Sequence, residues 1–209
     1  MSIPDRRTLI ADTAIDLVAA AGLRGLTHRA VDAAARLPAG STSYYFRTRT
    51  ALIGACYQRL AELDLGDLGT FGNSRESGGP KDSGDLDGGG PPALDRDAAA
   101  EALAALLYRW LTTGRARQLA RFELSLEAAR TPELAPELHR AGLGARARAT
   151  AILTGLGAQR PQEAAEFLVG WTDGLLYDRL AGALARSRPA PDLAELTSVV
   201  RRMVDAALA

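Results

Sequence analysis

The chain has 209 residues, 47% of them hydrophobic, and its 25 basic residues balance its 25 acidic ones. This length and apolar content are enough for a folded core, and the zero net charge means that any attraction to nucleic acid must be local. The single cysteine, Cys56, excludes an internal disulfide and a cysteine-based zinc cluster. No signal peptide and no long apolar run is recognisable, which predicts a cytoplasmic protein without a membrane partner.

Two short helices joined by a tight turn are expected after a longer first helix. The first helix runs from about residue 4 to residue 21 and is followed by a glycine stop signal. Thr27 caps a second helix that extends to residue 36, because its hydroxyl can accept an early backbone N–H. The segment 37–40 contains Pro and Gly and breaks this helix, and a third helix then covers residues 41–46.

The rest of the chain is also predicted to be helical, with one interruption. Thr48 caps a fourth helix whose periodicity dissolves from Gly66 to about Pro92. Residues 72–92 are rich in Gly, Ser, Asp and Pro, a composition that predicts a disordered loop. Further helices are expected from residue 95, around 119–129, from 132 with an interruption at Gly142 and Gly144, over 161–186 and over 192–208.

Positive charge is concentrated around the two short helices. The first 60 residues hold eight arginines and four aspartates, so this segment is net basic and the remainder compensates. A third helix beginning at Ser41 would present its N-terminal N–H groups and several hydroxyls to phosphate oxygens. Arg47 and Arg49 follow it, and Arg29 on the second helix can reach a guanine edge. This arrangement predicts a DNA-binding helix-turn-helix.

The stretch from Leu26 to Phe46, LTHRAVDAAARLPAGSTSYYF, continues as RTRTALI and resembles the TetR family of one-component regulators. The matching features are the threonine that opens the second helix, the small-residue turn, the aromatic pair before Phe46 and the basic residue before Ala51 and Leu52. The C-terminal part resembles the family more loosely, through its helix count and the sequence Asp173-Gly174-Leu175. Ser43 stands where the family commonly has a tyrosine.

The resemblance implies an all-α protein of about nine helices that is not an enzyme. It implies a DNA-binding domain over residues 1–47, with Phe46 packed into its core, and a ligand-binding and dimerisation domain over residues 48–209. The expected function is that of a repressor, a homodimer on a palindromic operator of double-stranded DNA that a small-molecule effector releases. Phosphate contacts are implied for Thr27, Tyr44, Tyr45 and Arg49, with Ser41 beside them, and base-facing positions for Arg29, Ala39, Gly40 and Ser43.

The central helices are expected to enclose the effector. The candidate ligand-binding residues are Trp110, Arg121, Phe122 and Trp171, which lie in largely apolar surroundings and predict a cavity with one or two polar anchors. Each aromatic side chain among them is also a candidate for the ordinary core. The last two long helices carry apolar stripes and small residues, and they are the expected dimer interface.

Two other function classes remain open at this point. One is a helical enzyme, although the sequence holds no HExxH, GxSxG or phosphate-loop motif, and no cofactor or metal site is expected from His28 and His139. The other is a helical ligand-binding protein that does not bind DNA. In that case Tyr44, Tyr45 and Phe46 would all be core residues of an unrelated helical bundle, and the arginines would form a solvated face. A strong salt dependence of duplex binding would distinguish the regulator from both.

Overall fold

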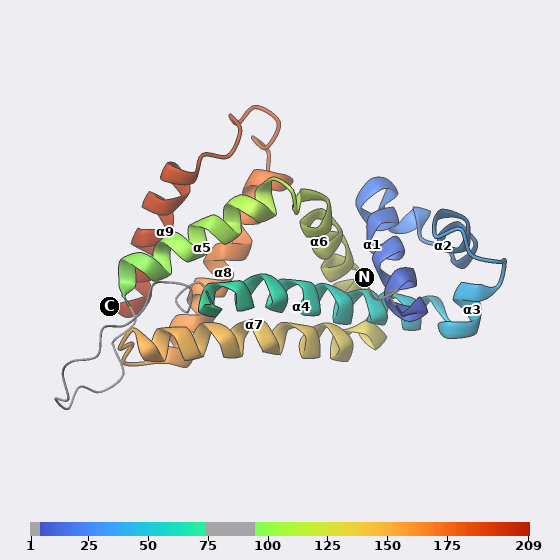
Figure 1. Cartoon of the computed structure of the whole chain (residues 1–209), viewed down its shortest axis with the longest axis horizontal. Helices are drawn as coiled ribbons and strands as arrows, with labels where there is room; N and C mark the ends of the chain where they lie inside the picture. Colours follow the sequence, from blue (N-terminus) through green and yellow to red (C-terminus); the bar gives the residue numbers. More distant parts are fainter. Residues whose placement is uncertain (1–4, 74–94) are drawn as a thin grey trace, which may run out of the picture.

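The computed structural model describes residues 5–73 and 95–209, and all regular structure in these ranges is helical. This confirms the predicted all-α fold with nine α-helices and adds a short 3-10 turn, η1. In Figure 1 the first three helices form a small group at one end of an elongated molecule. The helices are α1 (Arg6–Gly25), α2 (His28–Ala34), α3 (Ser41–Tyr45), α4 (Arg49–Asn73), α5 (Arg96–Leu111), α6 (Arg115–Arg130), η1 (Pro132–Leu134), α7 (Ala135–Gly155), α8 (Pro161–Leu180) and α9 (Leu193–Leu208).

Local capping sets the ends of the first helices. The helical backbone of α1 breaks at Gly22, where φ is 65°. Thr27 Oγ1 accepts the backbone N–H of Ala30 at 3.1 Å and caps α2, as the sequence predicts. Helix α2 ends two residues before the predicted Arg36, because Arg36 adopts a left-handed conformation with φ 54°. Leu37 N–H then bonds back to the Asp32 carbonyl at 2.8 Å, which is the Schellman form of helix ending.

Helix α4 is longer than the sequence predicts, since it continues past Gly66 to Asn73. Tertiary contacts outweigh the low helix propensity of its glycines. Asp67 accepts a hydrogen bond from Trp110 Nε1 at 2.8 Å and forms an ion pair with Arg117, which ties this part of α4 to α5 and α6. Of the predicted loop 72–92, residues 72 and 73 therefore belong to α4, and the others lie outside the described residues.

Helix α7 is continuous through Gly142 and Gly144, so the predicted interruption there is wrong. It runs beside α4 (Figure 1). A Cβ atom at Gly144 would lie 2.9 Å from Leu65 Cδ1, and the glycine thus permits this close approach. Helix α8 ends at Leu180, before the predicted residue 186, because the Ala181 and Gly182 N–H groups both bond to the Tyr177 carbonyl.

Two apolar cores hold the helices together. The first joins α1 and α2 to α4 and α6, through side chains such as Ile10, Phe46, Leu52 and Leu124. The second is built mainly from α5, α8 and α9 and the end of α7. Helices α4 and α6 therefore pack directly against the N-terminal group. Within the described ranges, no helix combines the length and apolar character that a membrane crossing requires.

Candidate nucleic-acid interface and effector cavity

A buried carboxylate organises the turn between α2 and α3. Only 4% of Asp32 is exposed. Its Oδ2 accepts the Gly40 N–H at 2.8 Å, and its Oδ1 accepts both the N–H and the hydroxyl of Thr42, at 2.7 and 2.6 Å. Burial alone would raise the pKa of Asp32, but these hydrogen bonds and nearby His28 outweigh burial and lower it below the ordinary value. The ionised carboxylate thus fixes the start of α3 against α2.

This arrangement corrects one prediction about phosphate binding. The N–H groups of Gly40 and Thr42 donate to Asp32, and the Ser41 N–H donates to the Pro38 carbonyl at 3.1 Å. The prediction that the first N–H groups of α3 are free for phosphate is therefore wrong. The sequence did not single out Asp32, because ten residues separate it from Thr42 and a lone aspartate on a short helix usually faces solvent.

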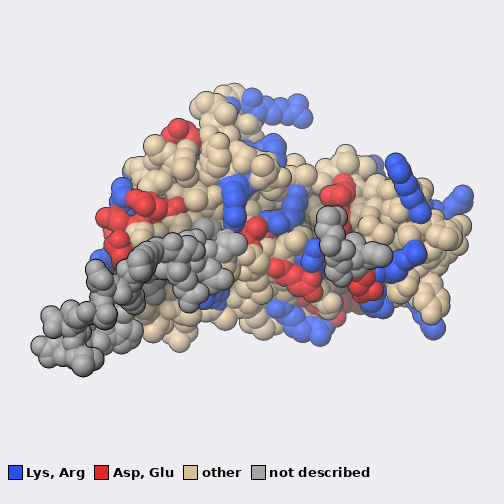
Figure 2. Space-filling model, viewed as in Figure 1, with Lys and Arg blue, Asp and Glu red and all other residues tan. Residues whose placement is uncertain are grey.

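Several predicted DNA-contacting residues lie on an exposed face at this end of the molecule. Tyr44 is 79% exposed, and its ring packs edge to face against Tyr45 with centroids 5.1 Å apart. Figure 2 shows Lys and Arg side chains projecting from the end formed by α1, α2 and α3. The other predicted residues that are exposed are Thr27, Arg29, Ala39, Gly40, Ser43 and Arg49.

Some of the predicted DNA-contacting residues also stabilise the helix-turn-helix itself. Ser41 Oγ donates to the Pro38 carbonyl at 2.6 Å. Arg49 Nη2 donates to the carbonyl of Leu23 at 2.6 Å and so stabilises the end of α1. Phe46 is buried in the first core, in agreement with the packing that the resemblance implied. A substitution at Arg49 would therefore alter both the surface charge and the geometry.

The N-terminal group is fastened to α4 and α6 by polar contacts as well as by its core. Glu123 Oε1 on α6 accepts the Leu23 N–H at 3.2 Å. Arg59 on α4 forms an ion pair with Asp12 on α1, with Nε and Oδ1 2.7 Å apart. A movement of α6 would consequently displace the end of α1, which leads into α2.

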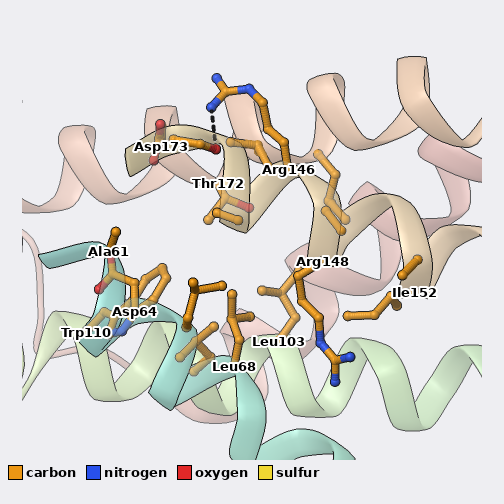
Figure 3. A pocket seen from close by; sticks show the side chains of 18 of the residues that line it. Ala61, Asp64, Leu68, Leu103, Trp110, Arg146, Arg148, Ile152, Thr172 and Asp173 are labelled. Carbon is orange, nitrogen blue, oxygen red and sulfur yellow. Dashed lines mark hydrogen bonds between the residues drawn. The ribbon is translucent and has the colours of Figure 1, made fainter. Parts of the chain in front are cut away.

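Helices α4, α5, α6, α7 and α8 surround a cavity of about 560 Å³ (Figure 3), and Val204 of α9 also reaches its wall. Its wall is largely aliphatic, with side chains such as Leu68, Leu103 and Ile152. Of the four predicted ligand-binding residues, Trp110 and Arg121 line it. Phe122 and Trp171 do not. Phe122 packs edge to face against Tyr177, and Trp171 is 40% exposed on the outside of α8.

The polar groups of the cavity include the predicted Arg121 and one carboxylate, Asp64, that the sequence analysis missed. Arg121 Nε donates to Gln118 Oε1 at 2.7 Å, and its Nη2 donates to Asp173 Oδ1 at 2.8 Å. Asp64 on α4 also lines the cavity, and burial raises its pKa to about 6 even though Arg121 and Arg117 lie nearby. No local pattern distinguishes Asp64 from an ordinary solvated aspartate on the same helix.

Comparison with known proteins identifies the family. Residues 94–207 match the family described as the tetracyclin repressor-like C-terminal domain, which is more than half of the chain. The chain belongs to the TetR family. Members of this family are transcriptional regulators rather than enzymes, so the enzymatic alternative is set aside. No curated protein matches the sequence significantly.

Solved structures of TetR-family and related regulators have the same fold. The multidrug binding protein EbrR in complex with imidazole is 27% identical, with a TM-score of 0.66 and coverage of 96% of both chains. A TetR-family member from Streptomyces coelicolor A3 is 28% identical, with a TM-score of 0.66 and coverage of 96% of this chain and 98% of the other. A transcriptional regulator from Rhodococcus sp. Rha1 has a TM-score of 0.73 at 20% identity and covers 98% of this chain and 96% of its own.

One exposed face of this TetR-family protein is apolar and aromatic. Phe167 and Trp171 on α8 are 53% and 40% exposed, and their rings stack with centroids 5.8 Å apart. Gly170 and Gly174 lie at helical spacing on the same face, and a Cβ at either would have no neighbour within 4 Å. By contrast, the apolar stripe of α9 is largely used in the second core, where Leu196, Val200 and Val204 are buried.

Proposed function

We propose that the protein is a sequence-specific DNA-binding repressor, active as a homodimer on a palindromic operator and released by a small-molecule effector. The helix-turn-helix held by Asp32, with Tyr44 and Arg29 exposed beside it, is the observation that carries the DNA-binding part. In this proposal residues 1–47 bind DNA, and residues 48–209 bind the effector and form the dimer.

The proposed DNA contacts are divided between backbone and bases. Hydroxyls and charges of Thr27, Tyr44, Tyr45 and Arg49 bind phosphates, which position the motif without reading sequence. Ser41 lies beside these phosphates, with its own hydroxyl proton donated to the Pro38 carbonyl. Arg29 binds a guanine edge in the major groove. Ala39, Gly40 and Ser43 offer only short side chains at the turn and the start of α3, so the remaining selectivity comes from close contact and DNA shape.

The cavity is the proposed effector site, with Trp110 and Arg121 among its binding residues. Its volume suits a drug-sized molecule. EbrR, of which structures with ethidium and malachite green are known at 28% and 29% identity, supports this assignment. Arg121 faces the cavity while Glu123 on the same helix holds Leu23, so an effector that prefers one position of α6 would bias the orientation of the DNA-binding end.

The exposed face of α8 is the proposed centre of the dimer interface. Exposed apolar side chains that cluster, as Phe167 and Trp171 do here, often mark an interaction surface. Its two glycines would let the same face of a second copy approach closely, as a two-fold axis requires. Trp171, assigned to the effector site from sequence, has its more natural role in this interface.

Replacing the most exposed tyrosine tests DNA binding directly. We expect Tyr44→Ala to weaken binding to all duplexes and to reduce the slope of log affinity against log salt by about one, because one phosphate contact is lost. Arg29→Ala is expected to relax selectivity at one base pair instead, at a cost of about 1–3 kcal/mol. Both are measured by fluorescence anisotropy on an operator selected from genomic fragments.

The control is Tyr108→Ala, which removes a partly exposed tyrosine from α5. It should bind the operator as the parent protein does. If Tyr44→Ala and Arg29→Ala also bind like the parent, or if the parent shows no salt-dependent duplex binding, the protein is instead a helical ligand-binding protein and the DNA-binding proposal is wrong.

A further inference from the structure

Within the described part of the chain, one carboxylate oxygen in the cavity has no protein partner. Asp64 lines the cavity, and 15% of its side chain is exposed. Its Oδ1 accepts a hydrogen bond from Gln118 Nε2 at 3.3 Å and lies 3.6 Å from Arg117 Nη2. Among the described residues, no donor bonds to Oδ2. An acceptor that faces the cavity is open to a hydrogen bond or a positive charge from a bound molecule.

The negative charge of Asp64 is only partly compensated. Arg117 is the nearest cation, but its Nη2 makes a closer ion pair with Asp67. Arg121, the next cation on α6, is committed to Asp173 and Gln118. Asp64 therefore shares its neighbouring arginines with two other carboxylates, and a further positive charge in the cavity would be favourable.

The two remaining arginines of the cavity wall do not supply that charge. The Arg146 side chain is exposed, and its Nη1 donates to the Gly142 carbonyl of its own helix at 3.3 Å. Arg148 is half-buried on the same helix, and Figure 3 shows its guanidinium directed away from the end that holds Asp64. Both lie on α7, whereas Asp64 is on α4.

An aromatic ring lies at the same end of the cavity as Asp64. Trp110 lines the cavity near Asp64 in Figure 3. Its Nε1 donates to Asp67 at 2.8 Å, which fixes the orientation of the indole. The face of a tryptophan ring attracts organic cations, most strongly where water is excluded. A carboxylate and an indole at one end of an aliphatic cavity thus both favour a bound organic cation.

Building on the effector site proposed above, we infer that its ligand is an organic cation with an apolar body, whose charged group binds at Asp64 and Trp110. The charge lies against the carboxylate and the indole. The apolar body extends along the aliphatic wall formed by residues such as Leu68, Leu103 and Ile152 (Figure 3).

Ethidium binding to the full-length protein, measured by fluorescence without DNA, tests this inference. Asp64→Asn keeps the size of the side chain but removes its charge, and we expect it to weaken ethidium binding at least about tenfold. The matched control is Glu62→Gln, which removes an exposed carboxylate from the same helix outside the cavity. We expect its affinity for ethidium to stay within about twofold of the parent value.

The pH dependence provides a second readout. Ethidium keeps its positive charge across the pH range from below 6 to 8, whereas Asp64 has a pKa of about 6. Its charged neighbours are Arg117, Arg121 and Asp67, and the arginines do not titrate there. The parent protein should therefore lose affinity for ethidium as the pH falls through 6, and Asp64→Asn should not. The variant should melt no lower than the parent at pH 8, because burial disfavours the ionised carboxylate.

Several outcomes would overturn the inference. These are no ethidium binding by the parent, equal binding by Asp64→Asn with the same pH profile, or tight laurate binding that Arg148→Gln abolishes. The last would identify the ligand as an anionic amphiphile. Operator release is measured separately with tetraphenylphosphonium, a cation that does not intercalate. If ethidium binds through Asp64 but tetraphenylphosphonium does not release the operator, the inferred cation site stands, whereas the proposal that the cavity is the effector site fails.

Discussion

Asp32→Ala is expected to abolish operator binding and to destabilise the protein by about 3 kcal/mol or more. The substitution leaves the Gly40 and Thr42 N–H groups and the Thr42 hydroxyl without their acceptor, and the last two of these are buried. The start of α3 then loses its attachment to α2, so the exposed side chains that follow lose their fixed positions. Urea denaturation and fluorescence anisotropy on the operator measure the two effects.

Two further measurements separate this role from a general loss of packing. Thr42→Val removes only the hydroxyl donor, and we expect it to cost about 1 kcal/mol. The pKa of Asp32 is lowered in the folded protein, so its ionised form contributes stability above the unfolded pKa, and this contribution is lost as the pH falls through the folded pKa. If Asp32→Ala keeps full operator affinity, the carboxylate does not position α3.

Gly174→Arg is expected to convert the dimer into a folded monomer at micromolar concentration. A Cβ atom at this position meets no atom of its own protomer within 4 Å, and replacing a helical glycine raises helix propensity by up to about 1 kcal/mol. The protomer should therefore fold normally, whereas two arginines facing each other across the two-fold axis would separate the subunits. Sedimentation measures the mass, and operator binding should be lost because a single motif reads too few base pairs.

Gly66→Arg is the matched control for this variant. Gly66 is also a helical glycine with open space around its Cβ position, but it lies on α4. It introduces the same charge and should remain dimeric. A charge placed at Met203 on α9 would not serve as well, because Met203 is partly buried against the second core and its replacement would confuse unfolding with dissociation. A dimeric Gly174→Arg protein would show that the exposed face of α8 is not the interface.

The sequence by itself determined the helical fold, the family and most of the helix-turn-helix. The sequence signals for these features act between residues a few positions apart, so they can be recognised without knowledge of the tertiary structure. The Thr27 hydroxyl caps α2 through an N–H three residues away. Pro38 and Gly40 keep the segment between α2 and α3 from forming a helix, because of their own backbone preferences. Phe46 was placed in the core by the motif around it, and it is buried there.

The tertiary structure decided the extent of the longer helices and the faces they bury. Periodicity dissolves after Gly66, yet α4 continues, because Asp67 meets Trp110 and Arg117 from distant parts of the sequence. Trp171 resembles Trp110 in sequence context, but it points outward from α8 while Trp110 is buried. An apolar residue has the same local propensity in both places, so only the packing of neighbouring helices separates core from surface.

The polar groups with the largest proposed roles were also beyond the reach of the sequence. Asp32 is buried because Thr42 and Gly40 supply hydrogen bonds across the turn, and Asp64 faces a cavity whose wall is built from several helices. Each is an unremarkable aspartate on an amphipathic helix when it is considered alone. The environment of a carboxylate depends on the donors, cations and apolar surface that folding brings to it, and these come from residues far along the chain.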